Sequence, residues 1–178
     1  MTIEQDAAWR CLCEYKIKSL PVDVLHIARS AGIKVIKNRD VNELLPSESG
    51  VAIYDGEHWY IIYDEENPAE RRRFTVAHEL GHIFLGHHIR KRYSARSKVF
   101  CIKPEIEQEA DMFAIGLLCP SCVLWGLNLH TADEIARACK VPYGVARICA
   151  ERMAVLYSPL EKEVYSNFQE YVRNGGKL

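Results

Sequence analysis

The segment His78-Glu79-Leu80-Gly81-His82 constrains this chain more than any other feature of its sequence. Two histidines four positions apart project from the same face of an α-helix, so both imidazoles can reach one metal ion. Neutral imidazole suits Zn²⁺, whose catalytic sites use three protein ligands and leave one position for water. Glu79 directly follows the first histidine, which places its carboxylate beside that open position as a general base. The motif therefore predicts a helix that carries part of a zinc site.

The residues around this motif carry the signals of a helix start and a helix end. Asn67 can cap a helix, Pro68 suits its first position, and Glu70 stands where a capping-box carboxylate belongs. Gly86 can end the helix after Leu85, because glycine readily adopts the left-handed conformation that follows a helix. We therefore predict one continuous helix from about Asn67 to Leu85.

A third ligand is predicted on a second helix, which covers about residues 104–118. Glu107 and Asp111 are four residues apart and therefore share one face of this helix. Glu107 can complete a site of two histidines and one glutamate, and Asp111 can accept a hydrogen bond from a ligand imidazole and so orient it. Glu105 and Glu109 then point elsewhere, and we interpret them as solvent-exposed.

His88 is an alternative third ligand, because it follows His78 by ten residues, as in the pattern H-E-x-x-H-x-x-G-x-x-H. That pattern requires glycine at position 85 for a sharp turn, and this chain has Leu85 there. We therefore favour Glu107, and we interpret His87 and His88 as a helix end that faces solvent.

The rest of the chain shows both helical and strand-like patterns. Helical spacing of apolar residues predicts further helices at about 6–18, 22–31, 131–157 and 160–173. β-branched and aromatic content predicts strands at 33–36, 50–54 and 58–63. Asp55-Gly56 between the last two strands is typical of a hairpin turn. Residues 87–103 are rich in lysine and arginine, and we interpret them as a loop. The fold class is therefore α+β.

Composition and charge exclude several classes of protein. With 178 residues, 48% hydrophobic and 26% charged, the chain is neither disordered, nor fibrous, nor a small disulfide scaffold. The length fits one domain over residues 1–178, with a core at about 1–125 and C-terminal helices at about 126–178. The formal net charge of −1 gives no general reason to expect nucleic-acid binding.

We find neither a signal-peptide pattern nor a membrane-spanning run, which predicts a cytoplasmic protein. In a reducing compartment most of the seven cysteines are expected to be free thiols. Cys119 and Cys122 form a C-x-x-C pair, but no second such pair exists, so we favour plain buried thiols. Cys101 lies just before the helix of Glu107 and could approach the zinc as an inhibitory thiolate.

Three segments of the chain resemble the ImmA/IrrE family of metallopeptidases. They are R-F-T-V-A-H-E-L-G-H at 73–82, E-Q-E-A-D-M-F-A at 107–114, and L-L-C-P at 117–120. The family patterns are R-F-T-x-A-H-E-L-G-H, E-x-E-A-N-x-F-A and L-L-x-P. This chain departs from them at Asp111, where asparagine is usual, and at Cys119, where methionine is common. The resemblance extends over about residues 15–157.

This resemblance implies a small thermolysin-like zincin core followed by extra C-terminal helices. In such a core the HExxH helix and the glutamate helix pack on a short, mostly antiparallel sheet. It also implies that His78, His82 and Glu107 bind Zn²⁺ and that Glu79 is the catalytic base. Finally, it implies cleavage of a partner helix-turn-helix repressor of a bacterial mobile element or stress response. The protein would then be a zinc endopeptidase that acts as an anti-repressor.

A second hypothesis is a non-catalytic repressor-binding or DNA-binding module with a structural zinc. Residues 131–147 have the sequence pattern of a helix-turn-helix. A recognition helix at 143–153 would, however, offer only Arg147 and Arg152 as basic residues, so we do not expect direct nucleic-acid binding. Glu79 also argues against a purely structural zinc, because such a site has no need of a base beside it.

Overall fold

The computed structural model describes residues 2–87, 90–91, 104–153 and 159–176. Its strands are β1 (Lys34–Lys37), β2 (Gly50–Tyr54), β3 (Trp59–Tyr63) and β4 (Arg90–Lys91), and the 3-10 helix η1 (Asn38–Asp40) follows β1. Its α-helices are α1 (Ile3–Glu14), α2 (Val24–Ser30), α3 (Ala69–Phe84), α4 (Pro104–Leu118), α5 (Ser121–Gly126), α6 (Ala132–Cys139), α7 (Tyr143–Arg152), α8 (Pro159–Asn167) and α9 (Gln169–Arg173).

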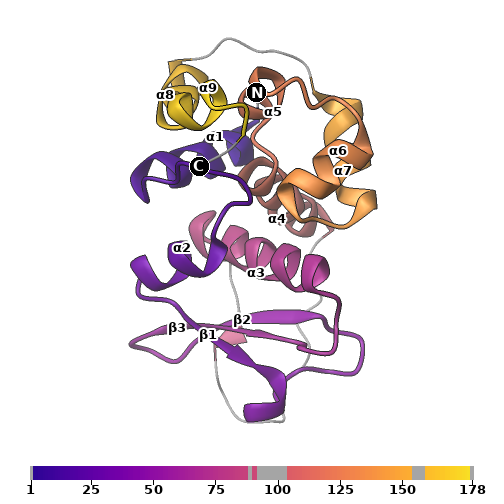
Figure 1. Cartoon of the computed structure of the whole chain (residues 1–178). Coiled ribbons are helices and arrows are strands. Elements are labelled where there is room, and N and C mark those ends of the chain that lie inside the picture. Colours follow the sequence, from indigo (N-terminus) through magenta and orange to yellow (C-terminus); the bar gives the residue numbers. More distant parts are fainter. Residues whose placement is uncertain (1, 88–89, 92–103, 154–158, 177–178) are drawn as a thin grey trace.

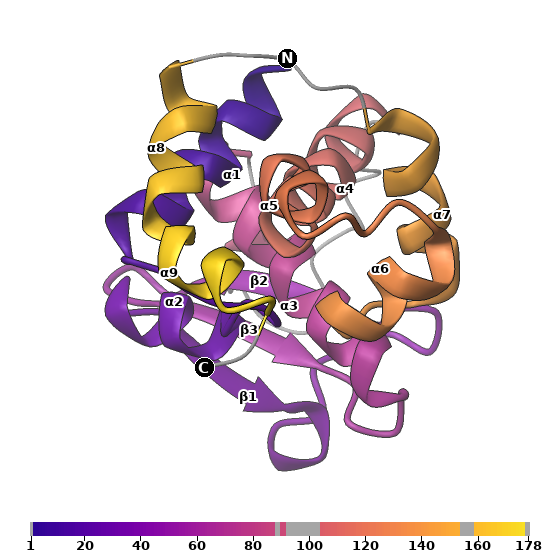
Figure 2. The same ribbon diagram turned by 45° about the horizontal axis from the view of Figure 1, so that its top comes forward.

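The helices are stacked in layers above one face of a small sheet (Figure 1). Helix α3 lies directly on that face, and α4 packs on α3. Helix α1 packs in turn against α4, and helices α5 to α9 lie further from the sheet (Figures 1 and 2). This arrangement confirms the α+β class and places the two helices of the predicted ligands in contact with each other.

The described strands form one mixed sheet in the order β1-β3-β2-β4. Strands β2 and β3 are antiparallel, as the Asp55-Gly56 turn predicted, whereas β1 pairs with β3 and β4 pairs with β2 in parallel. The expectation of a mostly antiparallel sheet was therefore wrong in this detail. A tight turn fixes the direction of its own hairpin only, and β1 and β4 reach their partners through longer connections that no local signal orients.

The sheet separates two apolar clusters. On the helix side, Ile61 of β3 belongs to the main core, which includes residues from α1 to α9. On the other side, a smaller cluster joins the sheet to the connection between β1 and β2, through Val51, Ile53, Ile62, Ile36, Val41 and Leu44. Because successive side chains of a strand point to opposite faces, β2 directs Gly50 and Ala52 toward α3.

The start of α3 differs from the prediction. The helix begins at Ala69, and Pro68 stands at the N-cap position without a side-chain cap hydrogen bond. Asn67 does not cap the helix; its Nδ2 donates to Oδ2 of Asp64 at 2.9 Å. The expected cap was therefore wrong, because a nearby carboxylate occupies the Asn67 side chain. The end of the helix lies where predicted, next to Gly86, whose φ is 71°.

The C-terminal part is more finely divided than the sequence predicted. Helix α5 follows Pro120 directly, and the expected helix at 160–173 is broken at Phe168 into α8 and α9. Helices α6 and α7 are joined through Lys140, which is left-handed with φ 53° and lies in the turn that the helix-turn-helix pattern of residues 131–147 predicted. The break at Phe168 was not predicted, because an apolar periodicity does not reveal where a helix is interrupted at a single residue.

One stretch of the described chain, Pro104–Gly126, is long and apolar enough by length and composition to cross a membrane. In the fold, 61% of its apolar window is buried inside the protein. The stretch comprises α4 and α5, and α4 packs between α1 and α3. Its apolar character is therefore accounted for by its place in the core.

Candidate metal centre

Two helices supply the side chains that the sequence predicted as metal ligands. His78 and His82 lie one turn apart on α3, and Glu107 lies in the first turn of α4. The two Nε2 atoms are 3.0 Å apart, and Glu107 oxygens lie 3.3 Å from Nε2 of His78 and 3.4 Å from Nε2 of His82. Within the described residues, these three side chains form the group whose donor atoms converge closely enough to hold a metal ion.

Asp111 lies one turn further along α4 and contacts the outer nitrogen of His78. Its Oδ1 is 2.8 Å from Nδ1 of His78. A histidine that presents the Nε2 lone pair to a metal carries its hydrogen on Nδ1, so Nδ1 donates to the carboxylate. The contact holds the His78 ring with Nε2 toward Glu107. The structure thus places Asp111 where the sequence predicted it.

Glu79 is buried between α3 and the sheet, with 7% of its surface exposed. The backbone N–H of Ala52 in β2 donates to its carboxylate. Gly50 leaves the space that this approach needs, because a Cβ there would lie 2.3 Å from Cγ2 of Thr75 and 3.4 Å from Oε1 of Glu79. Burial raises the pKa of Glu79 to about 7, although the charge of His78 opposes this rise. Such a carboxyl group can take up and return a proton near neutral pH.

The ligand side chains differ in how they hold protons in the metal-free protein. Burial disfavours a charged His78, but hydrogen bonds with Asp111 and Glu107 outweigh it and raise the pKa of His78 to about 10. Burial and the charge of His78 lower the pKa of His82 to about 4. The hydrogen bond with His78 lowers the pKa of Glu107. At neutral pH the imidazole of His78 therefore carries an additional proton and a positive charge, whereas His82 is neutral. A metal ion would displace that additional proton.

Two residues at this site were missed by the sequence interpretation, which placed both in solvent. Nδ1 of His87 lies 2.9 Å from Nδ1 of His82, and Nε2 of His87 lies 3.0 Å from Oε2 of Glu109. The side chain of His87 is only 8% exposed. The interpretation of His87 as a solvent-facing helix end was wrong, because the chain turns back at Gly86. That glycine was the available signal, since a left-handed glycine returns the following residue onto the last helical turn.

Three interpretations concern residues outside the described ranges. They are His88 as an alternative ligand, Cys101 as a thiolate near the metal, and most of the basic loop at 87–103. Of that loop, the structure describes His87, Arg90 and Lys91.

Within the described residues, no disulfide joins Cys119 and Cys122 of the C-x-x-C pair. Cys119 is buried, and Sγ of Cys149 in α7 donates to its carbonyl oxygen at 3.7 Å. Cys122 is half-buried at the start of α5. The expectation of buried thiols is thus confirmed for Cys119, whereas Cys122 is only partly buried.

Helices α6 and α7 have the predicted helix-turn-helix order. Thr131 and Glu134 form a capping box at the start of α6. On α7, Nη1 of the exposed Arg147 lies 2.7 Å from Oε1 of Glu151. The same helix exposes Ile148. Arg147 is thus paired on its own helix, and the exposed Arg152 of the same helix donates to Sδ of Met112.

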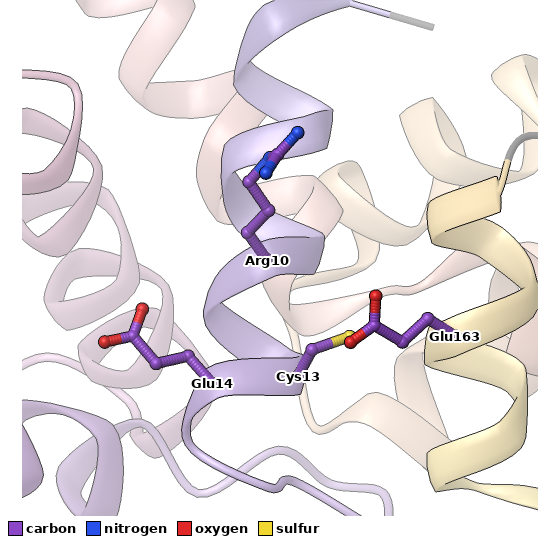
Figure 3. Close-up of a pocket in the computed structure, with 4 residues that line it drawn as sticks. All are labelled: Arg10, Cys13, Glu14 and Glu163. Carbon is purple, nitrogen blue, oxygen red and sulfur yellow. The ribbon is translucent and has the colours of Figure 1, made fainter.

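A separate pocket lies on α1 where this helix faces α8 (Figure 3). Arg10, Cys13, Glu14 and Glu163 line it, and the thiol of Cys13 points at the carboxylate of Glu163. Burial and the charge of Glu163 raise the pKa of Cys13 to about 11. The thiol is therefore protonated at neutral pH and is a weak nucleophile.

Comparison with known proteins agrees with the geometry of the ligand group. The family model of the M78 peptidases, described as the IrrE N-terminal-like domain, matches residues 28–151. This match confirms the resemblance to the ImmA/IrrE family and includes His78, Glu79, His82 and Glu107. No curated protein matches the chain. The family and the ligand group together support a metallopeptidase. Because the match covers well over half of the 178 residues, this chain belongs to the M78 peptidase family with an IrrE N-terminal-like domain.

Proposed function

We propose that this protein is a zinc-dependent endopeptidase. The spacing of the three donor atoms carries this proposal. In a tetrahedral zinc site with bonds of about 2.0–2.1 Å, neighbouring ligand atoms lie about 3.3 Å apart. The separations in this group are 3.0, 3.3 and 3.4 Å. Two imidazole nitrogens and one carboxylate leave a fourth position for water or substrate, which is the arrangement of a catalytic zinc.

Glu79 is the general base in this proposal. When bound, the zinc would act as a Lewis acid toward the attacking water and the scissile carbonyl. Glu79 accepts a proton from the water during its attack and then passes that proton to the leaving amine. Its burial beside His78 places the carboxyl group next to the ligand pair, and this burial raises its pKa. The N–H of Ala52 holds the carboxylate in orientation.

The edge of β2 is the proposed binding surface for the substrate chain. Ala52 directs its N–H to Glu79, so this edge of the strand faces the site. Alternate residues of a strand present their backbone groups to the same edge, and Gly50 therefore shares it. In the described residues, β4 pairs with Ile53 and Tyr54, beyond Ala52. An extended peptide can add to such an edge through backbone hydrogen bonds.

We further propose that the substrate is a helix-turn-helix transcriptional repressor of a bacterial mobile element or stress response, cleaved in the cytoplasm. Membership of the M78 family supports this proposal, because the ImmA/IrrE resemblance implies such a partner.

The variant Glu79→Gln separates catalysis from binding. Wild type or variant is co-expressed with the helix-turn-helix repressor proposed as its substrate, and an immunoblot follows the repressor while a reporter follows its promoter. We expect wild type to shorten the repressor. The variant should keep its zinc and its fold, while cleavage falls by at least about 10²-fold. Glu105→Gln is the matched control, because this exposed carboxylate lies outside the ligand group, and it should cleave like wild type.

Two results would overturn the proposal. If wild type and Glu79→Gln relieve repression equally while the repressor stays full length, the protein acts by sequestration, as the non-catalytic hypothesis holds. If elemental analysis of the purified wild type finds another metal or none, the assignment of zinc fails.

A further inference from the structure

The outer nitrogen of His82 contacts a second histidine rather than a carboxylate. Its Nδ1 lies 2.9 Å from Nδ1 of His87, and the two rings meet edge to face at 70° with centroids 5.1 Å apart. Nε2 of His87 lies 3.0 Å from Oε2 of Glu109. His82 and His87 are both nearly inaccessible to solvent, with side chains 5% and 8% exposed.

The end of helix α3 creates this contact. Gly86 is left-handed with φ 71°, its N–H donates to the carbonyl of Ile83, and the N–H of His87 donates to the carbonyl of His82 at 3.0 Å. This is a Schellman motif, in which the residue after the glycine packs on the third-last residue of the helix, commonly through an apolar contact. Here both positions are histidine, so the contact becomes a hydrogen bond between two rings.

The chemistry of the site sets the direction of these hydrogen bonds. If Nε2 of His82 offers its lone pair to the metal, its hydrogen resides on Nδ1, which must donate. Nδ1 of His87 must then accept, which leaves the hydrogen of His87 on Nε2. That N–H donates to the Glu109 carboxylate. Each hydrogen bond therefore joins one donor to one acceptor. The hydrogen bonds begin at His82 and end at the half-exposed carboxylate of Glu109.

We propose that His87 and Glu109 are positioning residues that fix the tautomer and ring orientation of His82. This inference rests on the metal site proposed above. His78 is held by Asp111 directly, whereas His82 is held by Glu109 through His87. Helix α4 therefore supplies the carboxylate ligand and also the carboxylates that orient both histidine ligands. Removal of such an orienting partner typically weakens metal binding by about 10–100-fold.

The hydrogen bonds from His82 through His87 to Glu109 are called the relay below. Two substitutions of His87 distinguish this relay from simple packing. His87→Phe keeps an aromatic ring but removes both ring nitrogens. His87→Gln offers an amide oxygen that can accept from His82 and an amide N–H that can donate to Glu109. Glu109→Ala removes the end of the relay, and Glu105→Ala is the matched control on the same helix. Zinc affinity of the full chain is measured by competition with a chromophoric chelator, and the Co²⁺-substituted proteins are compared by their visible absorption bands.

We expect His87→Phe to weaken zinc binding by about 10–100-fold and to change the Co²⁺ bands. His87→Gln should recover most of the affinity, Glu109→Ala should shift it in the same direction as His87→Phe, and Glu105→Ala should leave it unchanged. Wild-type affinity in His87→Phe would show that His87 only packs. Failure of His87→Gln to recover, or no effect of Glu109→Ala, would also overturn the relay.

A second readout does not depend on metal. In the metal-free wild type, nitrogen NMR of the His82 ring should show one tautomer, with the hydrogen on Nδ1, and His87→Phe should mix the tautomers. If wild type binds no zinc, the proposed function fails, and this spectrum still decides the relay. A mixture of tautomers in wild type would overturn it.

Discussion

Gly81 and Ala110 bring helices α3 and α4 into backbone contact. A Cβ at Gly81 would lie 3.1 Å from the carbonyl oxygen of Ala110 and 3.2 Å from its Cα. Gly81 directly precedes His82, and Ala110 lies one turn after Glu107. The missing side chain at position 81 therefore sets the separation between ligands that belong to different helices.

We expect Gly81→Ala to weaken both the fold and zinc binding. Alanine favours a helix over glycine by about 1 kcal/mol, but overpacking costs about 1–3 kcal/mol, and the opposing backbone of Ala110 cannot move aside as a side chain could. Urea unfolding and chelator competition measure the two effects. The control is Gly144→Ala in α7, where an added Cβ meets nothing within 4 Å; it should be neutral or stabilising. Unchanged zinc affinity in Gly81→Ala would contradict the role of this contact.

Asp111→Ala should weaken zinc binding by about 10–100-fold without unfolding the protein, because Asp111 orients His78 and is itself exposed. Competition with a chelator measures the affinity, and circular dichroism checks the fold. Asp111→Asn, which restores the residue usual in the family patterns, retains an acceptor oxygen and should lose less. If alanine binds zinc as tightly as wild type, Asp111 is only a surface residue of α4.

Zinc uptake near pH 8.5 should release about one proton from His78, and ionisation of a zinc-bound water can add about one more. At that pH the metal-free protein keeps a proton on His78, whose pKa is about 10, while His82 and Glu79, with pKa values of about 4 and 7, have lost theirs. Zinc must displace the His78 proton, so its apparent affinity should rise about tenfold per pH unit until the pH passes that pKa. Calorimetry in two buffers of different ionisation enthalpy counts the protons. A release near zero would show that His78 is already neutral, and Asp111→Ala should reduce the release.

Arg73→Ala should destabilise the fold by about 1.5–3 kcal/mol without removing zinc. The guanidinium of Arg73 in α3 donates to the carbonyl oxygens of Val22, Cys139 and Lys140 at 2.9, 3.3 and 3.1 Å, and so joins α3 to the end of α6. Chemical unfolding measures the loss. Arg147→Ala is the control, because its ion pair is fully on the surface and should contribute less than about 1 kcal/mol. Equal losses of stability in both variants would show that the hydrogen bonds of Arg73 between α3 and the end of α6 contribute no more than a surface ion pair.

The spacing of residues along the chain was sufficient for the parts of the site that lie within one helix. His78 and His82 share a face of α3, and Glu107 and Asp111 share a face of α4, because positions four apart in any helix do so. The same local reasoning located the hairpin of β2 and β3 and the end of α3 at Gly86. It was wrong for the cap at Asn67, where Asp64 competes for the side chain.

The tertiary structure decided everything that depends on approach between elements. The parallel pairing of β1, the burial of Glu79 against Ala52 and the close contact of Gly81 with α4 arise from packing between segments far apart in sequence. The relay from His82 through His87 to Glu109 depends both on a local sequence signal and on packing between helices. Its turn is encoded locally by Gly86, but its final partner lies on α4, so periodicity within one helix could not reveal that Glu109 faces His87. The sequence thus determined which residues share a helical face, and only the packed structure determined which faces meet, because packing depends on side-chain volume and backbone approach across the whole fold.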